Sequence, residues 1–173
     1  MVTRQEALGT LEEGHRAITE LVERLSDVDF ERGATIGGGE WSARDLVGHL
    51  TTWEEVALEA LEQWRLGERP TVETEIFGSA EGIDAFNART VEAKRARTGQ
   101  EIREAAGRIH DAVAGEIGDM EDDEWNARAP YETERRRHLS ELLGSILGAP
   151  KRPFGHVFAH LGDLRAYVES LEP

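Results

Sequence analysis

Amphipathic helical periodicity recurs along most of this sequence, and it is the feature that most constrains the fold. Residues 3–26 begin with the capping-box pattern Thr3-Arg4-Gln5-Glu6, after which apolar side chains recur at intervals of three and four positions. Residues 42–67 repeat this arrangement behind Ser42-Ala43-Arg44-Asp45. Segments with this period bury one face against other helices. The pattern therefore predicts an all-α protein.

The second half of the sequence continues the same pattern. Residues 82–117 carry an apolar stripe, and a further capping box at Thr98 predicts a break or kink within it. Residues 134–147 read as another helix. The last helix is expected to begin near Pro153, a residue suited to a first helical turn, and to end near residue 171. Long helical regions without a convincing strand predict a four-helix bundle.

Length, charge and cysteine content narrow the class of protein. The 173 residues fit one domain spanning residues 1–173. With 20 basic against 35 acidic side chains the net charge is −15, which argues against nucleic acid and anionic membranes as partners. We expect a cytoplasmic protein, because the sequence shows neither a signal-peptide pattern nor an apolar run long enough to span a membrane. Without cysteine, a transition-metal site requires imidazole and carboxylate ligands.

Six histidines are present, and three of them are candidate metal ligands. His156 and His160 are four residues apart, which on the expected last helix places both imidazoles on one face. Such spacing offers two nitrogens to one ion, although it also arises by chance. His49 lies in an apolar run on the side of its helix expected to face the core, where a hydrogen-bonded core histidine is the other interpretation. His15, His110 and His138 stand among charged residues and are expected on solvated faces.

Four further residues are candidates for the surroundings of such a site. Asp45 lies one turn before His49, and Asp163 lies three residues after His160, so each is either an orienting partner of a ligand or a surface acid. Trp53, one turn after His49, either packs in the core or walls a pocket. Arg165 either binds a substrate carboxylate or pairs with a surface acid.

Two histidine segments carry a resemblance to a known family. Residues 40–54 have a Trp-Ser opening followed by His49 and then Trp-Glu, and residues 156–167 have His-x-x-x-His followed by Leu-x-x-Leu-Arg-Ala and an aromatic residue. Residues 84–88, Asp-Ala-Phe-Asn-Ala, add a weaker match. The sequence thus resembles the DinB/YfiT-like superfamily, in particular the branch named for the N-terminal domain of mycothiol-dependent maleylpyruvate isomerase.

That resemblance implies a four-helix bundle that holds a divalent metal, zinc or nickel, on three residues. By position, the implied ligands are His49, His156 and His160. In the isomerase one ligand is a carboxylate, and this chain has His156 in that place, which weakens the case for maleylpyruvate isomerisation. Three protein ligands leave at least one coordination position open, as in reactive rather than structural sites.

The expected function is activation of a low-molecular-weight thiol, of the mycothiol or bacillithiol type, for S-transfer or isomerisation of a small-molecule substrate. Two alternatives are a metal-dependent hydrolase that activates water, and a ClbS-like protein that binds a reactive small molecule for self-protection. Small bundles of the superfamily often dimerise, so the resemblance also allows a homodimer.

Overall fold

The computed structural model describes residues 2–37, 39–79 and 82–171, and within them the chain is helical, with isolated β-bridges in place of strands. This confirms the predicted all-α class. No helix in these ranges is long and apolar enough to cross a membrane. The frame of the bundle consists of α1 (Arg4–Glu23), α3 (Ala43–Arg65), α5 (Gly99–Asp119), α7 (Leu139–Ile146) and α8 (Leu161–Ser170). The remaining elements are α2 (Asp27–Glu31), the π-helical turn η1 (Val72–Ile76), α4 (Gly82–Lys94), α6 (Asp122–Trp125) and the 3₁₀ turn η2 (Val157–Ala159).

Capping boxes start the three longest helices, as the sequence predicts. The hydroxyls of Thr3, Ser42 and Thr98 each accept a hydrogen bond from the backbone N–H three residues later, and the acidic side chain at that position accepts from the cap backbone. Such a cap contributes about 1 kcal/mol. The cap at Thr98 separates α4 from α5, which confirms the predicted break.

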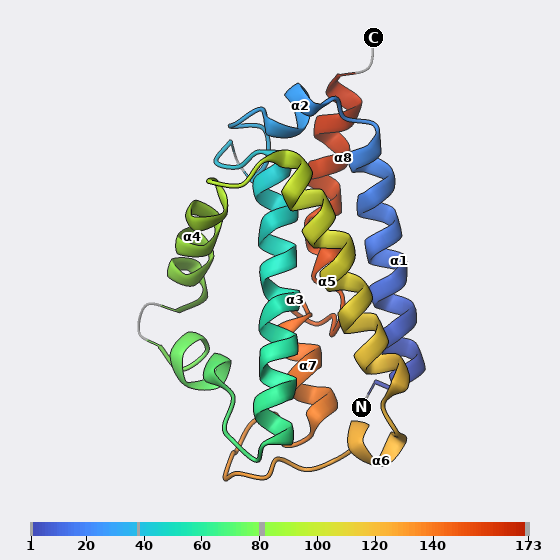
Figure 1. The fold of residues 1–173 in the computed structure, drawn as a ribbon, viewed down its shortest axis with the longest axis vertical. Coiled ribbons are helices and arrows are strands. Elements are labelled where there is room, and N and C mark those ends of the chain that lie inside the picture. The colour runs from blue at the N-terminus through green and yellow to red at the C-terminus, as the bar shows by residue number, and fades with distance from the viewer. Residues whose placement is uncertain (1, 38, 80–81, 172–173) are drawn as a thin grey trace.

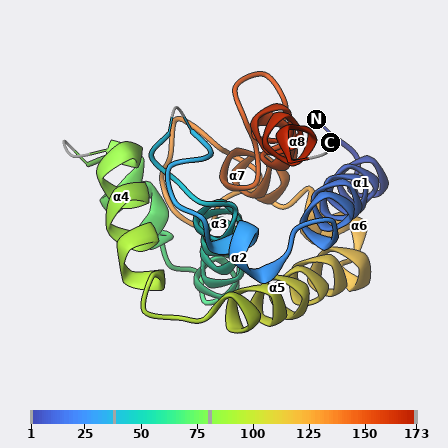
Figure 2. The same ribbon diagram turned by 90° about the horizontal axis from the view of Figure 1, so that it is seen from above.

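The bundle has α1, α3 and α5 at three corners, while α7 and α8 follow one another along the fourth (Figures 1 and 2). Helix α4 lies outside this frame, against α3. The core comprises two apolar clusters. One contains Trp125 and Phe154 near α6 and α7, and the other contains Phe30 and Leu164 near α2 and α8.

The fourth corner differs from the two continuous helices predicted for residues 134–147 and 153–171. Helix α7 begins only at Leu139, because the preceding segment forms a bridge to residue 128. Helix α8 begins at Leu161 rather than near Pro153. The reason lies at Phe154, which is buried, stacks on Trp125 and adopts a φ of 59°, outside the right-handed helical region. The chain between the two helices is therefore irregular.

Candidate metal centre

Three imidazoles converge between α3 and the irregular segment of the fourth corner. His49 extends from the middle of α3, whereas His156 and His160 flank η2 instead of sharing one α-helix. The Nε2 atom of His156 lies 3.1 Å from Nε2 of His49 and 3.3 Å from Nε2 of His160. The three histidines can each offer one nitrogen within 4.8 Å of the others. The irregular segment thus brings together the side chains that the sequence singles out.

The nitrogen separations fit a common ion. Nitrogens bound at about 2.1 Å are about 3.0 Å apart at a right angle between ligands and about 3.4 Å apart at the tetrahedral angle. Both distances at His156 fall between these values. In a neutral imidazole, each nitrogen carries either the one N–H or the one lone pair. The Nε2 of His156 can therefore form a good hydrogen bond to only one of the two other Nε2 atoms. The donor set fits zinc or nickel, both of which accept imidazole.

Burial keeps these imidazoles uncharged at neutral pH. His49 is 2% exposed. Burial, and then the charges of His156, His160 and Lys94, lower the pKa of His49 to about 2. Burial, together with the charge of His160, lowers the pKa of His156 to about 4. Burial also lowers the pKa of His160, against the opposing effect of the Asp163 carboxylate. A metal ligand must be deprotonated, so all three histidines are in the state that binding requires.

Aromatic side chains flank the imidazoles on two sides. The ring centroid of Trp41 lies 4.9 Å from that of His49 and 6.4 Å from that of His160. Trp53 lies edge-on to His156 at 6.0 Å, and its indole N–H donates to the side-chain oxygen of Asn87 over 3.1 Å. Trp53 therefore both packs in the core, where it is 4% exposed, and forms a wall of the site.

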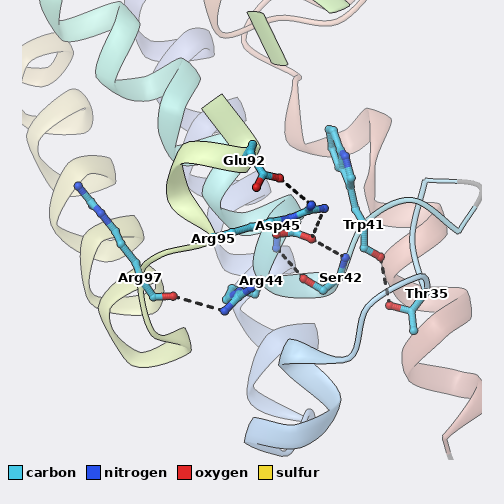
Figure 3. A network of polar contacts seen from close by, with 8 residues as sticks. All are labelled: Thr35, Trp41, Ser42, Arg44, Asp45, Glu92, Arg95 and Arg97. Carbon is cyan, nitrogen blue, oxygen red and sulfur yellow. Dashed lines mark hydrogen bonds and ion pairs between the residues drawn. The ribbon is translucent and has the colours of Figure 1, made fainter. Parts of the chain in front are cut away.

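The N-terminus of α3 is fixed by a polar network (Figure 3). Asp45 accepts from the backbone N–H of Ser42, and Arg95 lies 3.5 Å from its carboxylate. The carbonyl of Trp41 accepts from the backbone N–H of Thr35. These contacts hold Trp41 beside the helix that carries His49. The carboxylate of Asp45 thus completes the helix cap, and its partners are Ser42 and Arg95 rather than the imidazole of His49.

The other sequence candidates, Asp163 and Arg165, both lie on α8. Asp163 is exposed and affects His160 through its charge, and Arg165 is exposed on α8. Nδ1 of His49 is buried without a hydrogen-bond partner among the described protein groups. Sequence reasoning missed Trp41 and Asn87 as neighbours of the site. The tryptophan in the Trp-Ser opening was a usable signal for the first, and the weaker match at residues 84–88 contains the second.

One prediction about the remaining histidines is wrong. His110 is 5% exposed, not solvated. Its Nδ1 lies 2.9 Å from a carboxylate oxygen of Glu54, and its ring stacks on that of His15 at 3.7 Å between centroids. Charged neighbours along the sequence misled the prediction, because they lie on the other faces of α5.

Comparison with known proteins bears on the family and the fold of this chain. Residues 11–143 match the family described as the mycothiol maleylpyruvate isomerase N-terminal domain. The matched segment contains His49 and ends before His156 and His160. A crystal structure of an uncharacterised protein from Escherichia coli UTI89 superimposes with a TM-score of 0.79 at 16% identity, covering 98% of this chain and 95% of that one. That likeness shows the fold alone. A search of curated proteins found no match.

Proposed function

Because the chain belongs to the mycothiol maleylpyruvate isomerase N-terminal domain family, we propose that it is a metal-dependent enzyme that uses a low-molecular-weight thiol. The proposed reaction is S-transfer to, or isomerisation of, a small electrophilic substrate. The observation that carries the proposal is the convergence of three uncharged imidazole nitrogens from His49, His156 and His160. Zinc or nickel is the proposed ion.

A divalent ion on three histidines supplies Lewis acidity at an open position, which lowers the pKa of a bound thiol or water. The protein supplies the neutral ligands and the aromatic walls formed by Trp41 and Trp53. These walls reduce water around the site and so strengthen electrostatic interactions there. Since the chain has no cysteine, the reacting sulfur belongs to the cosubstrate.

In S-transfer, a bond forms between the thiol sulfur and an electrophilic carbon, the bond from that carbon to its leaving group breaks, and the thiol proton passes to solvent. No external oxidant or reductant is needed. The test is turnover of 1-chloro-2,4-dinitrobenzene by metal-loaded protein with mycothiol, with bacillithiol, and with the S-methylated form of each thiol. We expect chloride release with a free thiol and none with the methylated controls.

Matched variants connect the activity to the site. His160→Gln removes one proposed ligand, whereas His138→Gln alters a histidine outside the cluster. We expect the first variant to fall to the uncatalysed rate and the second to retain wild-type turnover. Hydrolysis of ester or amide substrates without any thiol would instead favour the hydrolase function. Wild-type turnover by His160→Gln would exclude both metal-dependent functions.

A further inference from the structure

A cavity lies along the side of α3 that carries Val47, Leu50 and Glu54, and His49 is not on that side of the helix. It has a volume of about 250 Å³ and is lined by residues of α1, α3 and α5, with Val157 also in its wall. Its middle is lined by apolar side chains, among them Ile18, Val22 and Leu50. The three candidate metal ligands do not line it. The cavity is therefore a separate feature of the bundle.

The length of the cavity follows from the helices around it. On α3 it extends from Val47 to Glu54, and on α1 from His15 to Glu23. Seven residues of α-helix rise about 10.5 Å, so the cavity runs along roughly two helical turns. An engineered apolar cavity of about 150 Å³ accepts benzene, and drug-sized pockets begin near 300 Å³. The dimensions thus suit a short, elongated apolar molecule.

Charged groups lie at both ends of the cavity, and two of them, Glu54 and Arg103, already have a partner. At one end the carboxylate of Glu54 contacts His110 at 2.9 Å, beneath the stacked ring of His15. At the other end Arg103 donates to Asp27 over 2.8 Å and lies over the ring of Phe30. Glu54 and Arg103 are already paired, and Glu23, which also lines the cavity, is exposed to solvent. An ionic ligand would therefore gain little to offset the cost of its own desolvation.

The Glu54 end can still accept a hydrogen bond. One carboxylate oxygen contacts His110, and a carboxylate has further lone pairs available. Burial and the charge of His110 lower the pKa of His15 to about 4, so its imidazole is neutral at neutral pH and retains an acceptor nitrogen. A hydroxyl group donates one hydrogen bond at a small desolvation cost. It is the head group that best matches this end.

A glycine in the wall supports the interpretation of this space as a binding site. Gly107 lies in the middle of α5 and lines the cavity, and a Cβ atom there would meet nothing within 4 Å. Glycine destabilises a helix interior relative to alanine. The absence of a side chain at this position leaves the cavity open.

We propose that the cavity between α1, α3 and α5 binds a neutral, elongated apolar molecule with one hydroxyl group, which donates to Glu54 or His15. The site is distinct from the imidazole cluster and does not depend on a metal. Octan-1-ol is a suitable probe, and octanoate and octylamine match its length with a negative or positive head group.

The test measures binding of these three probes to the full-length protein by calorimetry and by methyl chemical shifts of Ile18, Val22 and Val157. We expect saturable binding of one octan-1-ol, with shifts at these methyl groups, and binding of both charged probes weaker by about tenfold or more. Tighter binding of either charged probe would overturn the neutral-head assignment. An absence of saturable binding would overturn the site.

A matched pair of variants locates the ligand. Gly107→Leu fills the cavity, whereas Gly115→Leu makes the same change at an exposed position of the same helix that also has open space around it. We expect Gly107→Leu to weaken octan-1-ol binding by about tenfold or more and Gly115→Leu to leave it unchanged. Thermal unfolding confirms that both variants are folded. A folded Gly107→Leu that binds like wild type would refute the location.

Metal removal separates this site from the proposed enzyme centre. Octan-1-ol binding is expected to be equal in metal-loaded and chelator-treated protein, and in His156→Ala. If removal of the metal abolished binding, the ligand would lie at the imidazole cluster and the cavity proposal would fail. Loss of thiol-dependent activity alone would not affect it.

Discussion

His49 makes the metal-free protein sensitive to acid, and the size of the effect can be worked out. Its pKa falls from 6.5 to about 2 because the side chain is buried and close to His156, His160 and Lys94. In the unfolded chain the imidazole regains the ordinary value. Below pH 6.5 the unfolded state therefore binds a proton that the folded state does not. The free energy of unfolding consequently decreases as the pH is lowered.

The size of the stability loss follows from how far the pH lies below the pKa of the unfolded imidazole. A pH of 5 lies about 1.5 units below the pKa of the unfolded imidazole, which is therefore protonated, whereas folded His49 stays neutral. Each unit is worth about 1.4 kcal/mol. His49 alone thus removes about 2 kcal/mol of stability between pH 7.5 and pH 5.

Urea unfolding of chelator-treated wild type and His49→Gln at the two pH values tests this prediction. We expect wild type to lose about 2 kcal/mol more than the variant on acidification. A constant difference in stability between the proteins cancels, because only the change with pH is compared. Thr52→Ala, at another buried position of α3, serves as control and should follow wild type. Equal losses in wild type and His49→Gln would refute the reasoning.

Three further predictions concern contacts that hold the site and its neighbours. Ser42→Ala removes the cap of α3 and should lower the free energy of unfolding by about 1 kcal/mol in urea titrations; no change would mean that the cap contributes nothing. Asn87→Leu leaves the buried indole N–H of Trp53 without its acceptor, so we expect a loss of about 1–3 kcal/mol and an altered near-ultraviolet circular dichroism spectrum. An unchanged spectrum would show that Asn87 does not position Trp53. Glu54→Leu leaves buried His110 without its carboxylate partner and should lower the free energy of unfolding by about 1–3 kcal/mol. The double variant Glu54→Leu/His110→Phe should recover part of that loss in the same titration. Strictly additive losses would argue against a specific pair.

Local signals along the sequence predicted much of the bundle. The boxes at Thr3, Ser42 and Thr98 act within one helical turn, so their residues predict the helix starts directly. The apolar period then predicts which faces are buried. These features depend on short-range interactions, which a single sequence displays.

The fourth corner could not be predicted in this way. Residues 153–160 have helical spacing, yet burial of Phe154 against Trp125 imposes an irregular conformation. The contact joins segments far apart in the sequence, and it overrides local preference. His156 and His160 converge all the same, because the irregular segment directs both rings toward His49. Their spacing was a correct guide to the site and a wrong guide to its backbone.

Buried polar contacts were the other gap. His110 has charged sequence neighbours, but its own face meets Glu54 and His15 from two other helices. Likewise, Asp45 stands one turn from His49 and yet completes a helix cap. Spacing alone does not distinguish a capping carboxylate from one that orients a metal ligand.

The most direct test of the proposed enzyme centre is the metal content of the purified protein, measured by elemental analysis alongside His49→Ala, His156→Ala and His160→Ala. His138→Ala is the control for loss of an unrelated histidine. We predict about one zinc or nickel ion per chain in wild type and in the control, and little in the three ligand variants. A wild-type protein without stoichiometric metal after incubation with either ion, or ligand variants that retain it, would contradict the account.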